Sequence, residues 1–205
     1  MTALTLFWAF DILGTFVFGL SGAMVAIRQR FDLFGVLVLA AATGVAGGIL
    51  RDVLLGSTPP DVLRSLWPIG LACAAGLAAF FLGALIDRMN RPVMVLDALG
   101  LGVFAIAGCQ KALLHGVAAP GAVLLGVITA VGGGVVRDIM ANEVPRVLRE
   151  EVYALAALAG AAVYLGGLRA GLEETVAAMA GLILAVAIRL ASVRWGWNLP
   201  RAPWF

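Results

Sequence analysis

Long apolar stretches separated by short polar segments recur along the whole chain. A helix that crosses a bilayer needs roughly 20 mostly apolar residues. Seven stretches come close to this length, although charged residues interrupt some of them. The pattern therefore predicts an all-α membrane protein with seven transmembrane helices. The predicted spans cover residues 5–27, 34–55, 66–86, 92–114, 118–140, 152–169 and 175–193.

The amino-acid composition supports this interpretation. Of the 205 residues, 62% are hydrophobic and 13% are charged, whereas soluble domains are about half apolar and a quarter charged. A soluble fold of this size could not bury so much apolar surface, so the surrounding solvent is expected to be lipid. Because the segments between spans are short, residues 1–205 are expected to form a single membrane domain.

Other chemistry finds little support in the sequence. The net charge of +2 is too small and too scattered to suggest a nucleic-acid partner. Cys73 and Cys109 stand alone in apolar stretches, so buried free thiols are expected rather than metal ligands. The spans contain no pattern that suggests a nucleophile with its base, and we expect neither an enzyme nor a cofactor.

The basic residues predict the orientation of the chain. Short loops rich in Lys and Arg stay on the cytoplasmic side of a membrane. With the N-terminus outside, ten of the 14 Lys and Arg residues fall on the inner side and four on the outer side. We therefore predict a multi-pass protein of the cell (inner) membrane, with its N-terminus outside and its C-terminus in the cytoplasm.

One segment of the chain occurs twice. GVAGGILRDVLLG at 44–56 aligns with AVGGGVVRDIMAN at 130–142, and the same offset aligns residues further upstream. Unrelated apolar helices would match by chance at Ala, Leu and Val, but these matches fall on Gly, Asp, Arg and Thr. The chain is therefore expected to be an internal duplication. The upstream matches include Asp11 with Asp97, Gly14 with Gly100, Phe18 with Phe104 and Gly22 with Gly108.

The duplication predicts an inverted-topology repeat. Each copy holds three spans, at about 5–86 and 92–169, and the seventh span, 175–193, lies outside both copies. Because three is odd, the second copy starts from the opposite side of the membrane. The two Arg-Asp pairs should then lie toward opposite faces, with the two glycine clusters closer together and deeper in the membrane.

The glycine clusters are the first candidate functional feature. Each glycine inside a helix costs roughly 1 kcal/mol relative to alanine, so a run of them favours a kink or a break. Broken helices at matching places in two inverted halves indicate a transport pathway, and tight helix packing is the alternative explanation. The candidate pore residues are Thr43, Ala46, Gly47, Gly48, Thr129, Gly132, Gly133 and Gly134.

Charged residues inside the spans are the second candidate feature, because they are expensive in lipid and mark functional pathways. Under the predicted orientation Asp11 and Arg51 share the outer half of the membrane, and Asp97 and Arg137 share the inner half. We expect an ion pair within each copy. Such pairs either border a pathway or act only as structural links.

Three further charged residues complete the candidate set. Asp52 and Asp138 directly follow the two arginines, and Lys111 aligns with the uncharged Val25. Lys111 either extends to the lipid head groups or projects near Asp52, where it would oppose cations. The second alternative makes it a candidate gating residue.

The two glycine and Arg-Asp segments resemble those of the prokaryotic TRIC (trimeric intracellular cation) channel family, whose sequence domain is also called the glycine transporter domain. The resemblance extends over nearly the whole chain. It implies a homotrimer with one potassium-permeable pore in each protomer. The second and fifth spans would bound this pore, and both would be kinked at their glycines. Ala46 replaces the first glycine of the triplet in the first copy, so a milder kink is expected there.

Two alternatives to a channel stay open at this point. A secondary transporter of glycine or another small neutral amino acid would use the same repeats around an occluded pocket. A structural protein would use the glycines for packing alone. The expected partners are monovalent cations, K⁺ or Na⁺, and the lipid bilayer.

Overall fold

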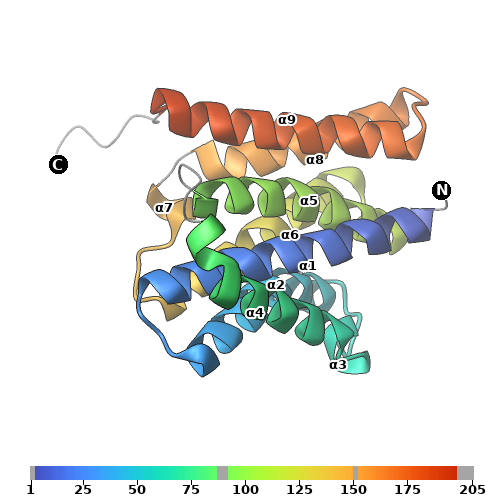
Figure 1. The fold of residues 1–205 in the computed structure, drawn as a ribbon. Coiled ribbons are helices and arrows are strands. Elements are labelled where there is room, and N and C mark those ends of the chain that lie inside the picture. The colour runs from blue at the N-terminus through green and yellow to red at the C-terminus, as the bar shows by residue number, and fades with distance from the viewer. Residues whose placement is uncertain (1–2, 87–91, 150–151, 198–205) are drawn as a thin grey trace, which may run out of the picture.

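The computed structural model describes residues 3–86, 92–149 and 152–197, and these ranges contain helices and connecting loops but no strand (Figure 1). The protein is an all-helical membrane protein. The described helices are α1 (Ala3–Arg28), α2 (Leu33–Leu54), α3 (Asp61–Arg64), α4 (Trp67–Ile86), α5 (Pro92–Leu114), α6 (Ala119–Met140), α7 (Arg146–Arg149), α8 (Val152–Arg169) and α9 (Glu174–Trp195).

The long helices occupy the ranges that the apolar stretches predicted, and their ends differ from the prediction by no more than two residues. Six of them are long and apolar enough to cross a membrane, and α4 is apolar over the shorter stretch Trp67–Gly83. The two four-residue helices α3 and α7 were not predicted. They lie at equivalent places, after Pro60 and Pro145, in the loops that follow the two Arg-Asp pairs.

Helices α2 and α6 end in the same way. Gly56 and Asn142, each two residues past its helix, have positive φ angles of 68° and 57°. The next amide then donates to the carbonyl of Asp52 at 2.9 Å in one case and of Asp138 at 2.8 Å in the other. Glycine and asparagine are the residues that adopt this left-handed conformation most readily, so the sequence sets both ends and the direction of the loops that follow.

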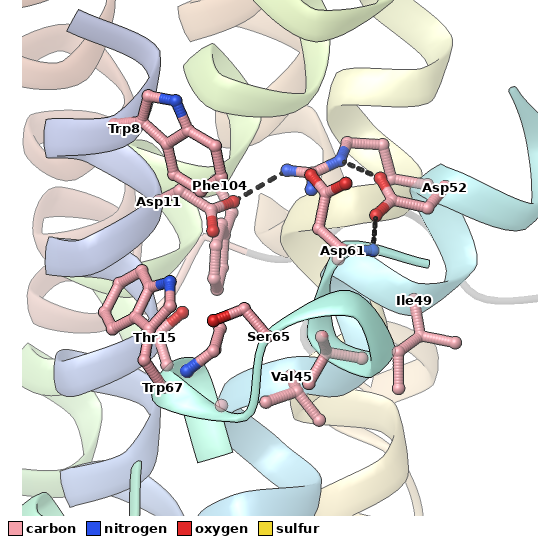
Figure 2. A pocket seen from close by; sticks show the side chains of 15 residues that line it. Trp8, Asp11, Thr15, Val45, Ile49, Asp52, Asp61, Ser65, Trp67 and Phe104 are labelled. Atoms are coloured by element: carbon pink, nitrogen blue, oxygen red, sulfur yellow. Dashed lines mark hydrogen bonds and ion pairs between the residues drawn. The ribbon is translucent and has the colours of Figure 1, made fainter. Parts of the chain in front are cut away.

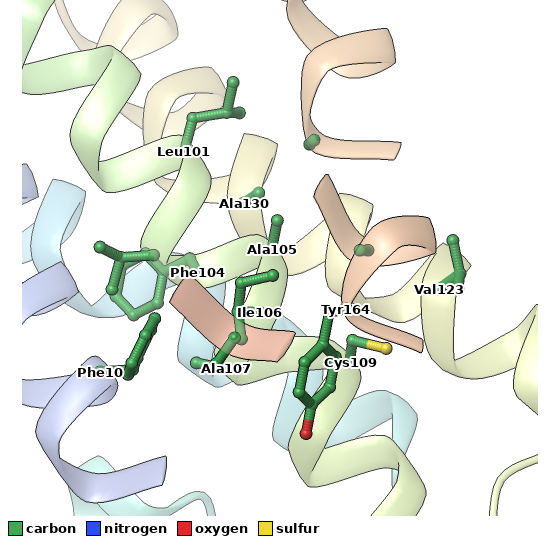
Figure 3. Packing of buried hydrophobic residues seen from close by; sticks show 14 of the residues in the cluster. Phe10, Leu101, Phe104, Ala105, Ile106, Ala107, Cys109, Val123, Ala130 and Tyr164 are labelled. Atoms are coloured by element: carbon green, nitrogen blue, oxygen red, sulfur yellow. The ribbon is translucent and has the colours of Figure 1, made fainter. Parts of the chain in front are cut away.

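Helices α1 and α5 form the centre of the molecule. Of their most apolar 18-residue windows, 72% and 78% are buried, against 33% in α8 and in α9. Helix α1 packs against α2, α4 and α5, and α5 packs against α1, α6, α8 and α9. Figure 3 shows part of the resulting core, with Phe104, Ile106 and Cys109 on α5. The two central helices therefore join the first and second halves of the chain.

Helix α9 packs on one side of this arrangement only. It contacts α8 and α5 and lies at the edge of the molecule in Figure 1. Gly160 on α8 and Gly181 on α9 allow the close approach, since a Cβ on Gly181 would lie 2.5 Å from the Gly160 carbonyl oxygen. The helix outside the predicted repeats thus packs on helices of the second half.

Candidate functional site: two buried charge clusters

Asp11, Arg51, Asp52, Lys111 and Asp61 form the first charge cluster. Arg51 donates to Asp11 and to Asp52, at 2.8 Å in each case. Lys111 bridges Asp52 at 2.7 Å and Asp61 at 2.6 Å. The side chains of Arg51, Asp52 and Lys111 are no more than 7% exposed, whereas that of Asp61 is 30% exposed. The predicted pairing of Asp11 with Arg51 is confirmed. Of the two alternatives for Lys111, the structure shows the one beside Asp52.

Two members of this environment were not anticipated from the sequence. The ring of Phe7 lies 5.1 Å from the guanidinium carbon of Arg51 and 5.5 Å from Nζ of Lys111. The backbone N–H of Asp61 donates to Oδ2 of Asp52 at 3.0 Å and so fixes the start of α3. Lys111 therefore does not extend to the lipid head groups, because two carboxylates and an aromatic face hold its ammonium.

Asp97, Arg137, Asp138 and Ser21 form the second charge cluster. Arg137 is ion-paired with Asp97 and, at 2.8 Å, with Asp138, and it donates to the Ser21 hydroxyl at 2.7 Å. Oδ2 of Asp138 accepts from the backbone N–H of Arg146 at 2.9 Å, at the start of α7. The predicted pairing of Asp97 with Arg137 is confirmed, and the contact between Asp138 and α7 matches that between Asp52 and α3.

A second arginine lies near this cluster. The guanidinium carbon of Arg189 on α9 is 4.8 Å from the centre of the Tyr153 ring on α8. Both side chains are buried. Sequence reasoning did not select them, because α9 lies outside the repeat and Tyr153 lies outside the duplicated glycine and Arg-Asp segments.

The glycine clusters of α2 and α6 pack directly on each other. A Cβ added to Gly47 would clash with the carbonyl oxygen of Thr129, and one added to Gly133 would clash with that of Thr43. Because a later residue on α2 meets an earlier one on α6 and the reverse, the two helices cross in an antiparallel sense. Small residues let backbones approach in this way.

The expected break in these helices is not found. Helix α2 is continuous over Leu33–Leu54 and α6 over Ala119–Met140, so both clusters lie inside regular helix. The hydroxyls of Thr43 and Thr129 donate to the carbonyls of Leu39 and Leu125 in their own helices, at 2.6 and 2.7 Å. The glycine runs remain helical and allow α2 and α6 to cross closely. A bend within either helix stays a prediction.

The remaining candidates lie beside this crossing. Gly132 faces α2, since a Cβ there would lie 2.8 Å from a methyl of Leu50. A Cβ on Gly134 would lie 2.8 Å from the Tyr153 hydroxyl. Gly48 faces open space, with only a guanidinium nitrogen of Arg51 near it at 3.6 Å. Ala46 is partly buried in α2.

A small pocket adjoins the first charge cluster. Figure 2 shows Asp11 and Thr15 of α1 on one side of it, and Asp61 on the other. Its remaining wall includes Gly48 of α2 and is aromatic in part, with contributions from α1, α4 and α5. The aromatic lining residues are Trp8, Trp67 and Phe104. Within the described residues no group of His, Cys, Asp and Glu side chains is arranged to hold a metal ion.

Comparison with known proteins places this arrangement in a family. A family model described as Glycine transporter matches the chain twice, over residues 8–84 and 94–169. A solved TRIC trimeric intracellular cation channel orthologue from Rhodobacter sphaeroides is 35% identical, with a TM-score of 0.89 over 94% of this chain and 100% of that one. The chain belongs to the TRIC family.

Two further relatives agree with this assignment. A second solved structure, from work on the structural basis for conductance through TRIC cation channels, is 38% identical to this chain. Its TM-score is 0.82, over 95% of this chain and 96% of that one. The inner membrane protein YadS of Escherichia coli K12 is 38% identical, over 93% of each chain. The two solved structures are described as cation channels and YadS as an inner membrane protein, and these non-enzymatic relatives confirm the prediction that the protein is not an enzyme.

Proposed function

We propose that this protein is a monovalent cation channel, with potassium as its expected ion and one path inside each protomer. The observation that carries the proposal is its similarity, at 35–38% identity over nearly the whole chain, to solved TRIC cation channels. The path is proposed to run between the two halves of the chain, from the pocket beside the first charge cluster toward the second.

The charges around the pocket support a cation as the permeant species. Three carboxylates, those of Asp11, Asp52 and Asp61, face two cations, Arg51 and Lys111. This gives the cluster a formal surplus of one negative charge. In a low-dielectric surrounding such a surplus raises the local concentration of small cations and repels anions.

The proposal includes the architecture predicted from the sequence: seven spans in one membrane domain, as two inverted three-helix repeats and a seventh helix. The two matches to one family model support the duplication. The antiparallel crossing of α2 and α6 supports the inversion. We also propose a homotrimer in the inner membrane, with the N-terminus outside and the C-terminus in the cytoplasm.

Potassium flux from liposomes that contain the purified protein tests the proposed function. We expect K⁺ flux down an imposed gradient that exceeds the flux in protein-free vesicles and is not reduced by added glycine. If folded protein, inserted into the liposomes in both orientations, carries neither K⁺ nor Na⁺, the channel proposal is contradicted.

Transport of glycine is the second candidate function. The family model carries the description Glycine transporter, and the pocket holds both a guanidinium and carboxylates, which could pair with the two charges of an amino acid. Saturable uptake of labelled glycine by the same liposomes, without K⁺ flux, would favour this function over the channel.

A further inference from the structure

Two phenylalanine rings meet between the two halves of the chain. Phe18 on α1 and Phe104 on α5 have ring centres 5.4 Å apart, at an angle of 51°. Both side chains are buried, and Phe104 also contributes to the wall of the pocket (Figure 2). They are an aromatic pair at the interface where the proposed path would run.

Each ring occupies space left by a glycine of the opposite helix. A Cβ on Gly14 of α1 would lie 2.8 Å from the Phe104 ring, and a Cβ on Gly100 of α5 would clash with the Phe18 ring. A Cβ on Gly133 of α6 would also lie 2.9 Å from the Phe18 ring. The backbone of three helices therefore fixes the position of the pair.

The pair lies between the two charge clusters along both central helices. On α1 the order is Asp11 in the first cluster, then Thr15 in the pocket, then Phe18, then Ser21 in the second cluster. Asp11 and Ser21 are separated by roughly 15 Å of helix, at a rise of about 1.5 Å per residue.

On α5 the order is reversed. Asp97 of the second cluster comes first, followed by Gly100, Phe104 and then Lys111 of the first cluster. A path from one cluster to the other along these two helices therefore passes the two rings.

We propose that the Phe18–Phe104 pair is the hydrophobic constriction that closes the cation path in this conformation. A narrow apolar segment excludes water and so blocks ions, even when the segments on both sides are polar. The inference rests on the proposed function, since it assumes that cations move between the clusters. The state described here is then a closed one, with its pocket open on one side of the rings.

Flux measurements on ring-truncated variants test the constriction. We expect Phe104→Ala and Phe18→Ala each to raise K⁺ flux severalfold over wild type, with Phe104→Leu intermediate because it keeps an apolar but smaller side chain. Phe81→Ala is the matched control, because Phe81 lies on α4 with 74% of its surface exposed, and its flux should equal that of wild type.

Thiol labelling gives a second readout that does not depend on ion flux. The labelling uses a background in which both native cysteines are removed by Cys73→Ala and Cys109→Ala. Thr15→Cys, in the pocket, first identifies the side of the membrane from which a membrane-impermeant cationic thiol reagent reaches the pocket. The reagent is then added on that side in all further experiments. Thr43→Cys lies beyond the rings, because the Thr43 side chain faces Gly22, one turn past Phe18. We expect the thiol of Thr43→Cys to be protected from the reagent as long as Phe104 is present. When Thr43→Cys is combined with Phe104→Ala or Phe104→Leu, the same thiol should be labelled.

The outcomes separate the two proposals. If wild type conducts and the folded alanine variants conduct no more than it does, the constriction is wrong and the channel stands. If no variant carries cations, the channel is wrong, and the labelling alone decides whether the rings block access. Equal labelling of Thr43→Cys with and without the Phe104 ring would overturn the constriction in either case.

Discussion

Lys111 has no charged equivalent in the other half, since Val25 occupies the aligned position. Its ammonium neutralises part of the negative charge of Asp52 and Asp61 beside the pocket. Its removal leaves the first charge cluster with two surplus negative charges, and an extra negative charge in a dry site strengthens attraction for cations.

Lys111→Ala is therefore expected to raise potassium flux, or at least not to abolish it. Lys111→Arg keeps the charge and should conduct like wild type. Liposome flux of the two variants and of wild type, measured side by side, provides the measurement. A loss of flux in Lys111→Ala protein that folds normally would contradict the assigned role.

Asp97 is expected to matter more for stability than Asp11. The Asp97 side chain is 0% exposed and that of Asp11 is 12% exposed, although each is paired with an arginine. Removing one partner of a buried pair costs about 3–5 kcal/mol, because the other charge is left unpaired. Asp97→Ala should lower the unfolding temperature in detergent more than Asp11→Ala does.

A matched control for this comparison is Glu143→Gln, which changes an exposed side chain that accepts from Gln29 at 3.0 Å. Its unfolding temperature should stay close to that of wild type. Equal losses for Asp97→Ala and Asp11→Ala would show that burial does not set the stability of the two pairs.

At the residue scale the repeat was the useful signal. It predicted both ion pairs, because charges at matching depths in matching spans have few other partners in lipid. It could not find Asp61 or Arg189. Asp61 aligns with Arg146, an opposite charge, and Arg189 lies on the helix outside the repeat. When an interacting residue is not repeated in the other half, the internal repeat of the sequence does not reveal it.

At the element scale, the contact between α2 and α6 depends on single glycines rather than on glycine content. A methyl group on Gly47 would meet the backbone of α6, which cannot move aside, whereas one on Gly48 meets only the end of a flexible arginine at 3.6 Å. Overpacking of this kind costs about 1–3 kcal/mol and sometimes more.

Gly47→Ala is therefore expected to destabilise the protomer clearly, and Gly48→Ala is expected to have little effect. The two variants change neighbouring residues of one helix by the same methyl group, so they control for helix propensity. Thermal unfolding followed by circular dichroism in detergent provides the measurement. Similar unfolding temperatures for the two variants would contradict the direct backbone contact.

The elements themselves were largely predictable, because apolar length and short polar interruptions fix where a membrane helix can begin and end. Whether the glycine runs break their helices was not predictable from the sequence. A run such as Gly132–Gly134 is compatible with a break and with a close crossing, and the choice depends on the partner helix. The continuity of both helices and the contacts of Gly47 and Gly133 with the carbonyls of Thr129 and Thr43 distinguish these outcomes, and the sequence gives neither.

At the scale of the whole molecule, the orientation is the prediction that is open to the most direct test. A reporter that fluoresces only in the cytoplasm, fused after Phe205, should be active, and a reporter active only outside should be inactive at the same place. The physical reason is the excess of basic residues in the loops assigned to the inner side. The reverse pattern would exchange the inner and outer assignments of the two charge clusters.

The reciprocal contact of Phe18 and Phe104 with Gly100 and Gly14 has a consequence for how such a chain could arise. Under the proposed inverted repeat, the first half alone carries both a protruding ring, Phe18, and the matching notch, Gly14. Two separate copies of that half, inserted in opposite directions, would present each other with the same ring and the same notch. Under that proposal the interface corresponds to the one expected of a dual-topology homodimer with fused subunits, and a short ancestral gene translated into both orientations would already have encoded the central contact of the present protein.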